Sequence, residues 1–357
     1  MYEMEPRERI LRAMRRQIPD RVPREAVFTL PVEEEFRLRT YASDYEAYFG
    51  MDRRTVVFRR PQPATDFSAY LDGIPIPEGA FTDEWGNLIV KGFKYRTTDY
   101  IYPMRNLKTA ADLAGYPFPD FRRDECHAHL DAEVKSIHDR GLAATGDLWG
   151  TFFERSWHLR GMDNLFFDFM DNQDFANALL DRMLDLRIFM AVRFAEAGVD
   201  ILHTGDDLGI QQTLLMSVPM WRKWFKSRLA KVWEAARRVK PDIIISYHSD
   251  GFIEPFIPDL IEIGLDVLNP VQPECMDPVE IKRKYGDHLA FFGTIGTQTT
   301  LPFGSPDEVR RTIRERIETV GRGGGLILAP SHMIEPDVPW ENILAFFEAA
   351  EAYGHYS

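Results

Sequence analysis

Apolar runs that end in polar clusters recur through the second half of the chain. Five of these runs read DILHTGDD (200–207), DIIISYHSDG (242–251), DVLNPVQPEC (266–275), LAFFGTIGTQ (289–298) and GLILAPSHMIEP (325–336). Segments with the apolar spacing of amphipathic helices separate most of these runs. The repeated order of strand, polar tip and helix predicts an α/β fold, a (β/α)₈ TIM barrel of parallel strands.

The first half of the chain follows this order less regularly. Apolar residues at helical spacing predict a helix over 6–18, and VPREAVFTL (22–30) is expected to form the first strand. The mixed pattern of residues 32–60 favours helix. LAATGDLWG (142–150) predicts a further strand, and the pattern over 152–170 predicts an amphipathic helix after it.

Residues 61–121 differ from the rest because they are rich in proline, glycine and aromatic residues. Within them, 82–95 predicts a hairpin that turns at Gly86–Asn87. The segment is too short, and too often interrupted by proline, to form a core of its own. We therefore expect one domain over 1–357, a barrel with an N-terminal helical and hairpin elaboration, in which 61–121 forms an excursion near the barrel mouth.

Composition excludes several classes of protein. The 357 residues are 45% apolar, which is enough for a large core, and the net charge of −13 disfavours nucleic-acid and anionic-membrane partners. The two cysteines cannot form a disulfide framework, and a reducing compartment is the simplest interpretation. The first residues lack the apolar core of a signal peptide, and no apolar run is long enough for a membrane span. We expect a soluble, cytoplasmic protein.

The polar tips define the candidate site, because active sites of TIM barrels lie at the carboxyl ends of the strands. The tips supply histidine, carboxylate, amide and thiol groups. They are His203, Asp206, Asp207, His248, Asp250, Gln272, Glu274, Cys275, Gln298 and His332.

Four of these residues form a plausible zinc-binding set of nitrogen, oxygen and sulfur donors, namely His248, Asp250, Cys275 and His332. His248 and Asp250 are two positions apart, so they point the same way if the strand continues through them. The alternative is that Asp250 caps the next helix and His248 makes a structural hydrogen bond. A free cysteine such as Cys275 is more often packed in a core than bound to a metal.

The remaining tips suggest catalytic and substrate-binding groups. Asp206, Asp207 and His203 are candidates for acid–base catalysis, although adjacent carboxylates cannot face the same way in a strand. One of the two aspartates is therefore expected to face the mouth, while the other caps the following segment. Other polar and aromatic groups at the tips are candidates for substrate binding, namely Asp147, Trp149, Gln272, Glu274 and Gln298.

Three stretches of sequence resemble the uroporphyrinogen decarboxylase superfamily. They are PRERILRAMRRQIPDRVP near the start, TDEWGN with YPFPD in the middle, and GGGLILAPSHMIEPDVPWENILAF near the end. Among its members, the chain looks most like the zinc-dependent, corrinoid-linked methyltransferases. The resemblance implies a TIM barrel, a zinc ion, a small methylated substrate, and a corrinoid (cobalamin) that carries the methyl group on a partner protein. Relatives of this kind are often homodimers.

The zinc motifs of that branch can be compared position by position. The branch holds zinc with a His-x-Cys-Gly tip and with a cysteine near the last strand, in a context like APxC. Here the first motif is HSDG (248–251) and the second is APSH (329–332). The histidine matches, while Asp250 and His332 replace the two cysteines. Both are competent zinc ligands. The harder ligand set favours an oxygen leaving group, such as that of a methyl ether.

Two alternatives to methyl transfer remain at this point. The first is a uroporphyrinogen decarboxylase-type decarboxylase, whose relatives have two arginines just after the first strand. The corresponding stretch here, VFTLPVEEEF (27–36), has no arginine, and Glu33, Glu34 and Glu35 would repel the carboxylates of a tetrapyrrole. The second alternative is a non-catalytic corrinoid- or tetrapyrrole-binding protein that keeps the pocket without the chemistry.

Overall fold

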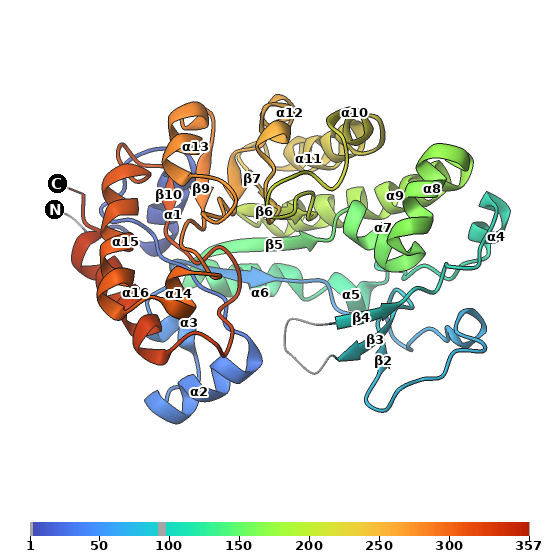
Figure 1. Cartoon of the computed structure of the whole chain (residues 1–357), viewed down its shortest axis with the longest axis horizontal. Coiled ribbons are helices and arrows are strands. Elements are labelled where there is room, and N and C mark those ends of the chain that lie inside the picture. The colour runs from blue at the N-terminus through green and yellow to red at the C-terminus, as the bar shows by residue number, and fades with distance from the viewer. Residues whose placement is uncertain (1–2, 92–97, 357) are drawn as a thin grey trace.

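The computed structural model describes residues 3–91 and 98–356, and its centre is a curled sheet of seven parallel strands (Figure 1). The ladder order is β1-β5-β6-β7-β8-β9-β10, so the strands of this sheet lie side by side in the order in which the chain forms them. The strands are β1 (Arg53–Val56), β5 (Ala143–Trp149), β6 (Ile201–Gly205), β7 (Ile244–His248), β8 (Val267–Asn269), β9 (Ala290–Phe292) and β10 (Leu326–Ile327). The predicted α/β class and the parallel order of the strands are confirmed.

Helices that precede, connect or follow these strands lie around the curled sheet (Figure 1). Those of the first half are α1 (Pro6–Met14), α2 (Leu30–Thr40), α3 (Tyr45–Tyr48), α4 (Ala110–Ala114), α5 (Asp124–His127), α6 (Leu130–Asp139), α7 (Phe153–Arg160) and α8 (Met162–Asp171). Those of the second half are α9 (Gln173–Ala197), α10 (Val218–Trp221), α11 (Ser227–Val239), α12 (Ile257–Glu262), α13 (Pro278–Tyr285), α14 (Thr300–Phe303), α15 (Pro306–Thr319) and α16 (Trp340–Tyr353). None of these helices combines the length and the apolar character that a membrane span needs.

The N-terminal segment differs from its prediction. Residues 22–30 make isolated parallel bridges, Arg24 with Leu328 and Phe28 with Ile334, and helix α2 begins at Leu30. They lie beside β10, but in the described residues no ladder joins them to β1, so a closed eight-stranded barrel stays a prediction. The interpretation of 32–60 as helix was wrong at its end, because β1 starts there and pairs with β5. The helix predicted over 152–170 is divided at Gly161, whose φ of 83° no helix accommodates.

Residues 61–121 contain a small antiparallel sheet of β2 (Phe81–Thr82), β3 (Leu88–Lys91) and β4 (Thr98–Ile101). The predicted hairpin is present between β2 and β3, and its last residues, 92–95, lie outside the described residues. The Asp83 carboxylate accepts hydrogen bonds from the backbone N–H groups of Trp85 and Asn87 and so fixes the turn. An ion pair of 3.2 Å between Arg155 and Asp83 connects this turn to α7.

Side chains alternate along the strands between two apolar layers. Ile201 of β6 and Ile244 of β7 point to the inner side of the curled sheet. They pack with Ile10 and Met14 of α1, which covers the amino ends of the strands. Leu202 and Ile245, one position further, belong to the layer between sheet and helices. Because the period of a strand is two residues, the next inward positions after the isoleucines lie nearer the carboxyl ends of the strands.

Candidate metal centre

A cavity of about 780 Å³ lies at the carboxyl ends of the strands. It contains most of the residues that the sequence predicts for the site. These are Asp147, Trp149, His203, Asp207, His248, Asp250, Gln272, Gln298 and His332. A second cavity, of about 810 Å³, lies at the opposite end, beside α1. Its buried Arg9 already pairs with Asp20 and Asp52, both at 2.7 Å, so we place the chemistry in the first cavity.

The period-two alternation explains why two histidines face this cavity. His203 follows Ile201 by two residues in β6, and His248 follows Ile244 by four residues in β7, so both share the inward parity. The Nδ1 atom of His203 lies 3.1 Å from Oγ of Ser246, which is also on an inward position. Burial, His248 and Arg53 together hold the pKa of His203 well below its usual range, so its imidazole is neutral.

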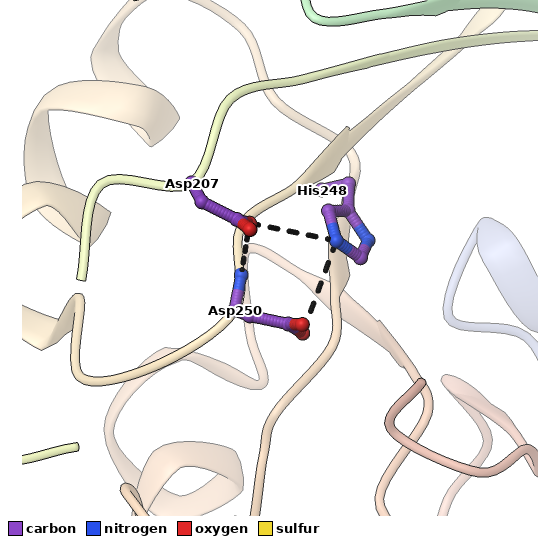
Figure 2. Close-up of side chains that lie close together, drawn as sticks. All are labelled: Asp207, His248 and Asp250. Carbon is purple, nitrogen blue, oxygen red and sulfur yellow. Dashed lines mark hydrogen bonds and ion pairs between the residues drawn. The ribbon is translucent and has the colours of Figure 1, made fainter. Parts of the chain in front are cut away.

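Three side chains form a group whose ligand atoms all lie within 4.8 Å of one another, namely Asp207, His248 and Asp250 (Figure 2). Nε2 of His248 is 3.6 Å from Oδ1 of Asp207 and 3.8 Å from Oδ1 of Asp250. The Asp250 N–H also donates to Oδ1 of Asp207 over 2.9 Å, which ties the two tips together. Nε2 of His332 lies 3.9 Å from Oδ2 of Asp250, so the tip after β10 reaches the same group.

Asn269 at the end of β8 sets the orientation of the His248 ring. Its Nδ2 donates to the backbone oxygen of Phe292 over 2.8 Å, which leaves Oδ1 to face Nδ1 of His248 at 2.7 Å. An amide oxygen only accepts, so Nδ1 of His248 is the protonated nitrogen. In the neutral ring, Nε2 then directs a lone pair towards Asp207 and Asp250, as metal-binding histidines require.

The electrostatics of this group favour a bound cation. Burial alone would lower the pKa of His248, but the carboxylates of Asp250 and Asp207 outweigh burial and raise it. Burial likewise raises the pKa of Asp250, with the neighbouring Asp207 adding to the effect. Oδ1 of Asp250 is buried and has no hydrogen-bond partner. A divalent cation would remove the repulsion between the carboxylates and coordinate the unpartnered oxygen.

The adjacent aspartates divide their roles as the alternation requires. Asp207 faces the cavity, whereas the buried carboxylate of Asp206 accepts hydrogen bonds of 3.0 Å from the N–H groups of Phe152 and Glu154 and so caps α7. The capped helix is thus the one after β5, not the segment that follows Asp206. Burial raises the pKa of Asp206 to about 7 in spite of these bonds. Asp206 is not among the described residues that line the cavity, so we no longer assign it a catalytic role.

Cys275 and Glu274 also lie outside the lining of the cavity. Sγ of Cys275 is 3.4 Å from Oε1 of Gln211, and the thiol is not part of the group around His248. Burial, Glu274 and Asp250 raise the pKa of Cys275 to about 11, which disfavours the thiolate that zinc binds. Glu274 accepts hydrogen bonds of 3.0 Å from Gln298 N–H and from the Thr299 hydroxyl, so it supports the neighbouring loop.

The three glutamates expected to face the substrate do not line the cavity either. They lie on α2, where Glu33 pairs with Arg37 and Glu35 with Arg39, one helical turn away. The repulsion expected between them and a substrate therefore has no structural basis.

Several lining residues were not singled out from the sequence: Glu25, Arg53, Asn269 and Glu335. Asn269 could have been found, because it ends an apolar run in the same way as His248 does. Glu25 and Arg53 could not be found in this way. Glu25 lies in 22–30, which forms isolated bridges instead of the expected strand, and Arg53 begins β1, in a stretch whose pattern favours helix.

Comparisons with known proteins identify the family of the chain. The sequence model of the family described as "Uroporphyrinogen decarboxylase (URO-D)" matches residues 153–353, which is more than half of the chain. The methylcobamide:CoM methyltransferase MtaA of Methanosarcina barkeri is 28% identical over 179 residues, and the same enzyme from its strain Fusaro (DSM 804) is 27% identical. The matched region is 49% of this chain and 49% of each relative, so the chain spans about half the length of these curated relatives.

The fold is similar to that of a solved methyltransferase from Methanosarcina mazei. The TM-score is 0.68 at 19% sequence identity, and the match covers 98% of this chain and 99% of the other. Among the described residues, the curled parallel sheet and its outer helices are thus those of a known methyltransferase structure. The chain belongs to the uroporphyrinogen decarboxylase family, and within that family its similarity is to the methyltransferases.

Proposed function

We propose that this protein is a zinc-dependent methyltransferase that moves a methyl group between a small methylated substrate and a corrinoid. The observation that supports this most strongly is the convergence of Asp207, His248 and Asp250 on one point of the cavity, with His332 beside them. Relatives named as methylcobamide:CoM methyltransferases support the same reaction class. We propose that the corrinoid is carried by a separate protein, as the resemblance to corrinoid-linked enzymes implies.

The residues present fit a zinc ion. Imidazole nitrogen and carboxylate oxygen are both common zinc ligands, and three protein ligands with one open position are typical of catalytic zinc sites. His248, Asp250 and His332 would hold the ion, and Asp207, which accepts from the Asp250 N–H, would add negative charge beside it; Cys275 would not bind it. The buried, unpartnered Oδ1 of Asp250 is the atom whose environment a cation would complete. The chemistry that zinc supplies in such a site is Lewis-acid polarisation of the atom that gives up the methyl group.

The chain's own residues would position the substrate and supply a proton. The set of two imidazoles and carboxylates is harder than a set with thiolates, which favours an oxygen leaving group such as that of a methyl ether. When a methyl group leaves an ether, the oxygen must take up a proton. Burial raises the pKa of Asp147, which lines the same cavity, so its carboxyl group keeps a proton to higher pH and is our candidate donor. Trp149 and Phe292 provide apolar walls.

Metal analysis of the purified protein, followed by an activity assay, tests this proposal. We expect about one zinc ion per chain in the wild type, and loss of most of it in His248→Ala and in His332→Ala. Cys275→Ser is the matched control, because it removes a nearby candidate ligand that we exclude, and it should keep its zinc. Zinc-loaded protein should then demethylate an aryl methyl ether with reduced cobalamin as acceptor. Unchanged zinc content in both histidine variants would end the proposal.

A further inference from the structure

A second unsatisfied group lines the cavity, at Glu335. Its side chain is only 4% exposed, and Oε2 is buried without a hydrogen-bond partner. The backbone beside it is fixed, because Ile334 N–H donates to the oxygen of Val27 over 2.8 Å and Thr29 N–H donates to the oxygen of Ile334 over 3.1 Å. The backbone that carries Glu335 is therefore fixed beside residues 27–29, in the wall of the cavity.

A buried carboxylate oxygen without a donor is costly, so its presence requires an explanation. The arginine of this cavity does not provide the donor, since Nε of Arg53 lies 3.2 Å from Oε2 of Glu25 and its Nη1 donates to the Thr55 hydroxyl over 3.0 Å. The Arg53 guanidinium also stacks 5.1 Å from the centre of the Phe292 ring. Among the described residues, no hydrogen bond or ion pair joins Arg53 to Glu335, and Nε of Arg53 is itself buried without a hydrogen-bond partner.

We propose that Glu335 binds a hydrogen-bond-donating group of the substrate, a hydroxyl or an ammonium. The substrate then has two functional ends, a methylated atom at the group formed by Asp207, His248 and Asp250, and an O–H or N–H donor at Glu335. The identity of the methylated end rests on the proposed function, whereas the donor site rests on Glu335 alone. A cavity of about 780 Å³ with Trp149 and Phe292 in its walls has the size and lining of a site for a small aromatic molecule.

Three probe molecules of matched size distinguish an ammonium donor from a hydroxyl donor and from no donor. They are 3-methoxybenzylamine, which is cationic at neutral pH, 3-methoxybenzyl alcohol, which is a neutral donor, and 3-ethylanisole, which has no donor. The dissociation constant of each is measured by calorimetry or by ligand-observed NMR on the wild type, Glu335→Gln, Glu335→Met and Glu335→Ala. Glu341→Gln, a change at an exposed glutamate, is the matched control.

We expect the preference of the wild type for a donor probe over 3-ethylanisole to fall about tenfold in Glu335→Met and in Glu335→Ala. If the donor is an ammonium, the amine shows the larger preference and loses it in Glu335→Gln as well. If the donor is a hydroxyl, the alcohol shows the preference and keeps most of it in Glu335→Gln. Glu341→Gln should keep the preference of the wild type. An equal preference in the wild type and in the folded apolar variants overturns the proposal, as does a wild type that binds neither donor probe better than 3-ethylanisole.

The binding measurements are made on chelator-treated protein without corrinoid, and repeated after zinc is added. The zinc-loaded protein with reduced cobalamin is assayed for methyl transfer in parallel. If it shows no methyl transfer while the donor preference depends on Glu335, the proposed function is refuted and the donor site is retained. Methyl transfer without such a preference would do the reverse.

Discussion

Nε2 of His332 lies 3.9 Å from Oδ2 of Asp250, although the strands before these residues are not neighbours. Asp250 follows β7 and His332 follows β10, and two strands, β8 and β9, lie between them in the sheet. The approach is possible because the sheet curls, so that the tips of separated strands face each other across one cavity. The same geometry brings groups from β6, β7 and the segment after β10 to one candidate ion.

The Asn269 side chain provides a test of the orientation of His248. Replacing it with leucine removes the acceptor for Nδ1–H, so the ring can rotate or change tautomer. We expect zinc affinity to fall about 10- to 100-fold in Asn269→Leu, measured by competition with a chromogenic chelator. Asn269→Asp keeps an acceptor at the same place and should lose less. Equal affinity in wild type and Asn269→Leu would show that this hydrogen bond does not prepare the ligand.

Substitutions of the two adjacent aspartates should have different effects, one on stability and the other on metal binding. Asp206→Ala removes the cap of α7, and we expect it to lower the free energy of unfolding by about 1–2 kcal/mol with little change in zinc affinity. Asp207→Ala should lower zinc affinity and change stability less. Urea denaturation of the metal-free proteins and zinc titration of the folded ones give the two readings. The reverse pattern would mean that the two carboxylates have been assigned to the wrong roles.

Gly205 provides a steric test. A Cβ atom there would lie 2.6 Å from Cβ of His248 and 2.7 Å from its backbone oxygen, so Gly205→Ala must displace the end of β7. We expect a loss of zinc affinity of at least about tenfold together with lower stability, because a shift of buried backbone costs free energy. Gly115→Ala is the control, since its Cβ would approach only one atom within 4 Å, at 3.7 Å. Zinc binding by Gly205→Ala at wild-type affinity would contradict the position of His248.

Glu25 predicts a pH dependence of stability. Burial raises its pKa to about 8 from an ordinary value of 4.5, with Asp52 adding to the effect and Arg53 opposing it. Between these values the folded protein keeps a proton that the unfolded chain has lost. The contribution of Glu25 to the free energy of unfolding therefore decreases as pH rises from 4.5 to 8, by up to about 1.4 kcal/mol per pH unit. Below 4.5 both states are protonated, and above 8 both are ionised.

Urea denaturation at several pH values measures this slope. Glu25→Gln cannot titrate and should flatten the decrease between pH 4.5 and 8. The control is Glu34→Gln, at an exposed position of α2, which should follow the wild type. Parallel curves for wild type and Glu25→Gln would show that Glu25 is ionised in the folded protein throughout this range.

Elements with a strong local pattern could be predicted from the sequence. An apolar run such as DIIISY has enough strand character to place His248 at its end, and the alternation of inward positions follows from the period of the strand. Strand β1 was missed because RRTV is short and polar, and its pairing with β5 is a long-range contact that no local pattern indicates. Helix α7 could not be separated from α8 without the backbone angle of Gly161.

The candidate site could also be predicted only in part. Residue types at the strand tips indicate which groups meet, but not which oxygen or sulfur atom turns towards the cavity. Asp206 and Asp207 are chemically identical, and only the N–H groups at the start of α7 decide that Asp206 turns away. Cys275 was a reasonable ligand by type, and its position beside Gln211 depends on a loop whose course the sequence does not specify.

Anomalous scattering at the zinc absorption edge, from a crystal of the purified protein, tests the central claim most directly. We predict a peak between the tips of β7 and β10, about 2.0–2.2 Å from Nε2 of His248, Nε2 of His332 and a carboxylate oxygen of Asp250. A zinc peak bound through Sγ of Cys275 instead, or no peak in this cavity from zinc-saturated crystals, would contradict it.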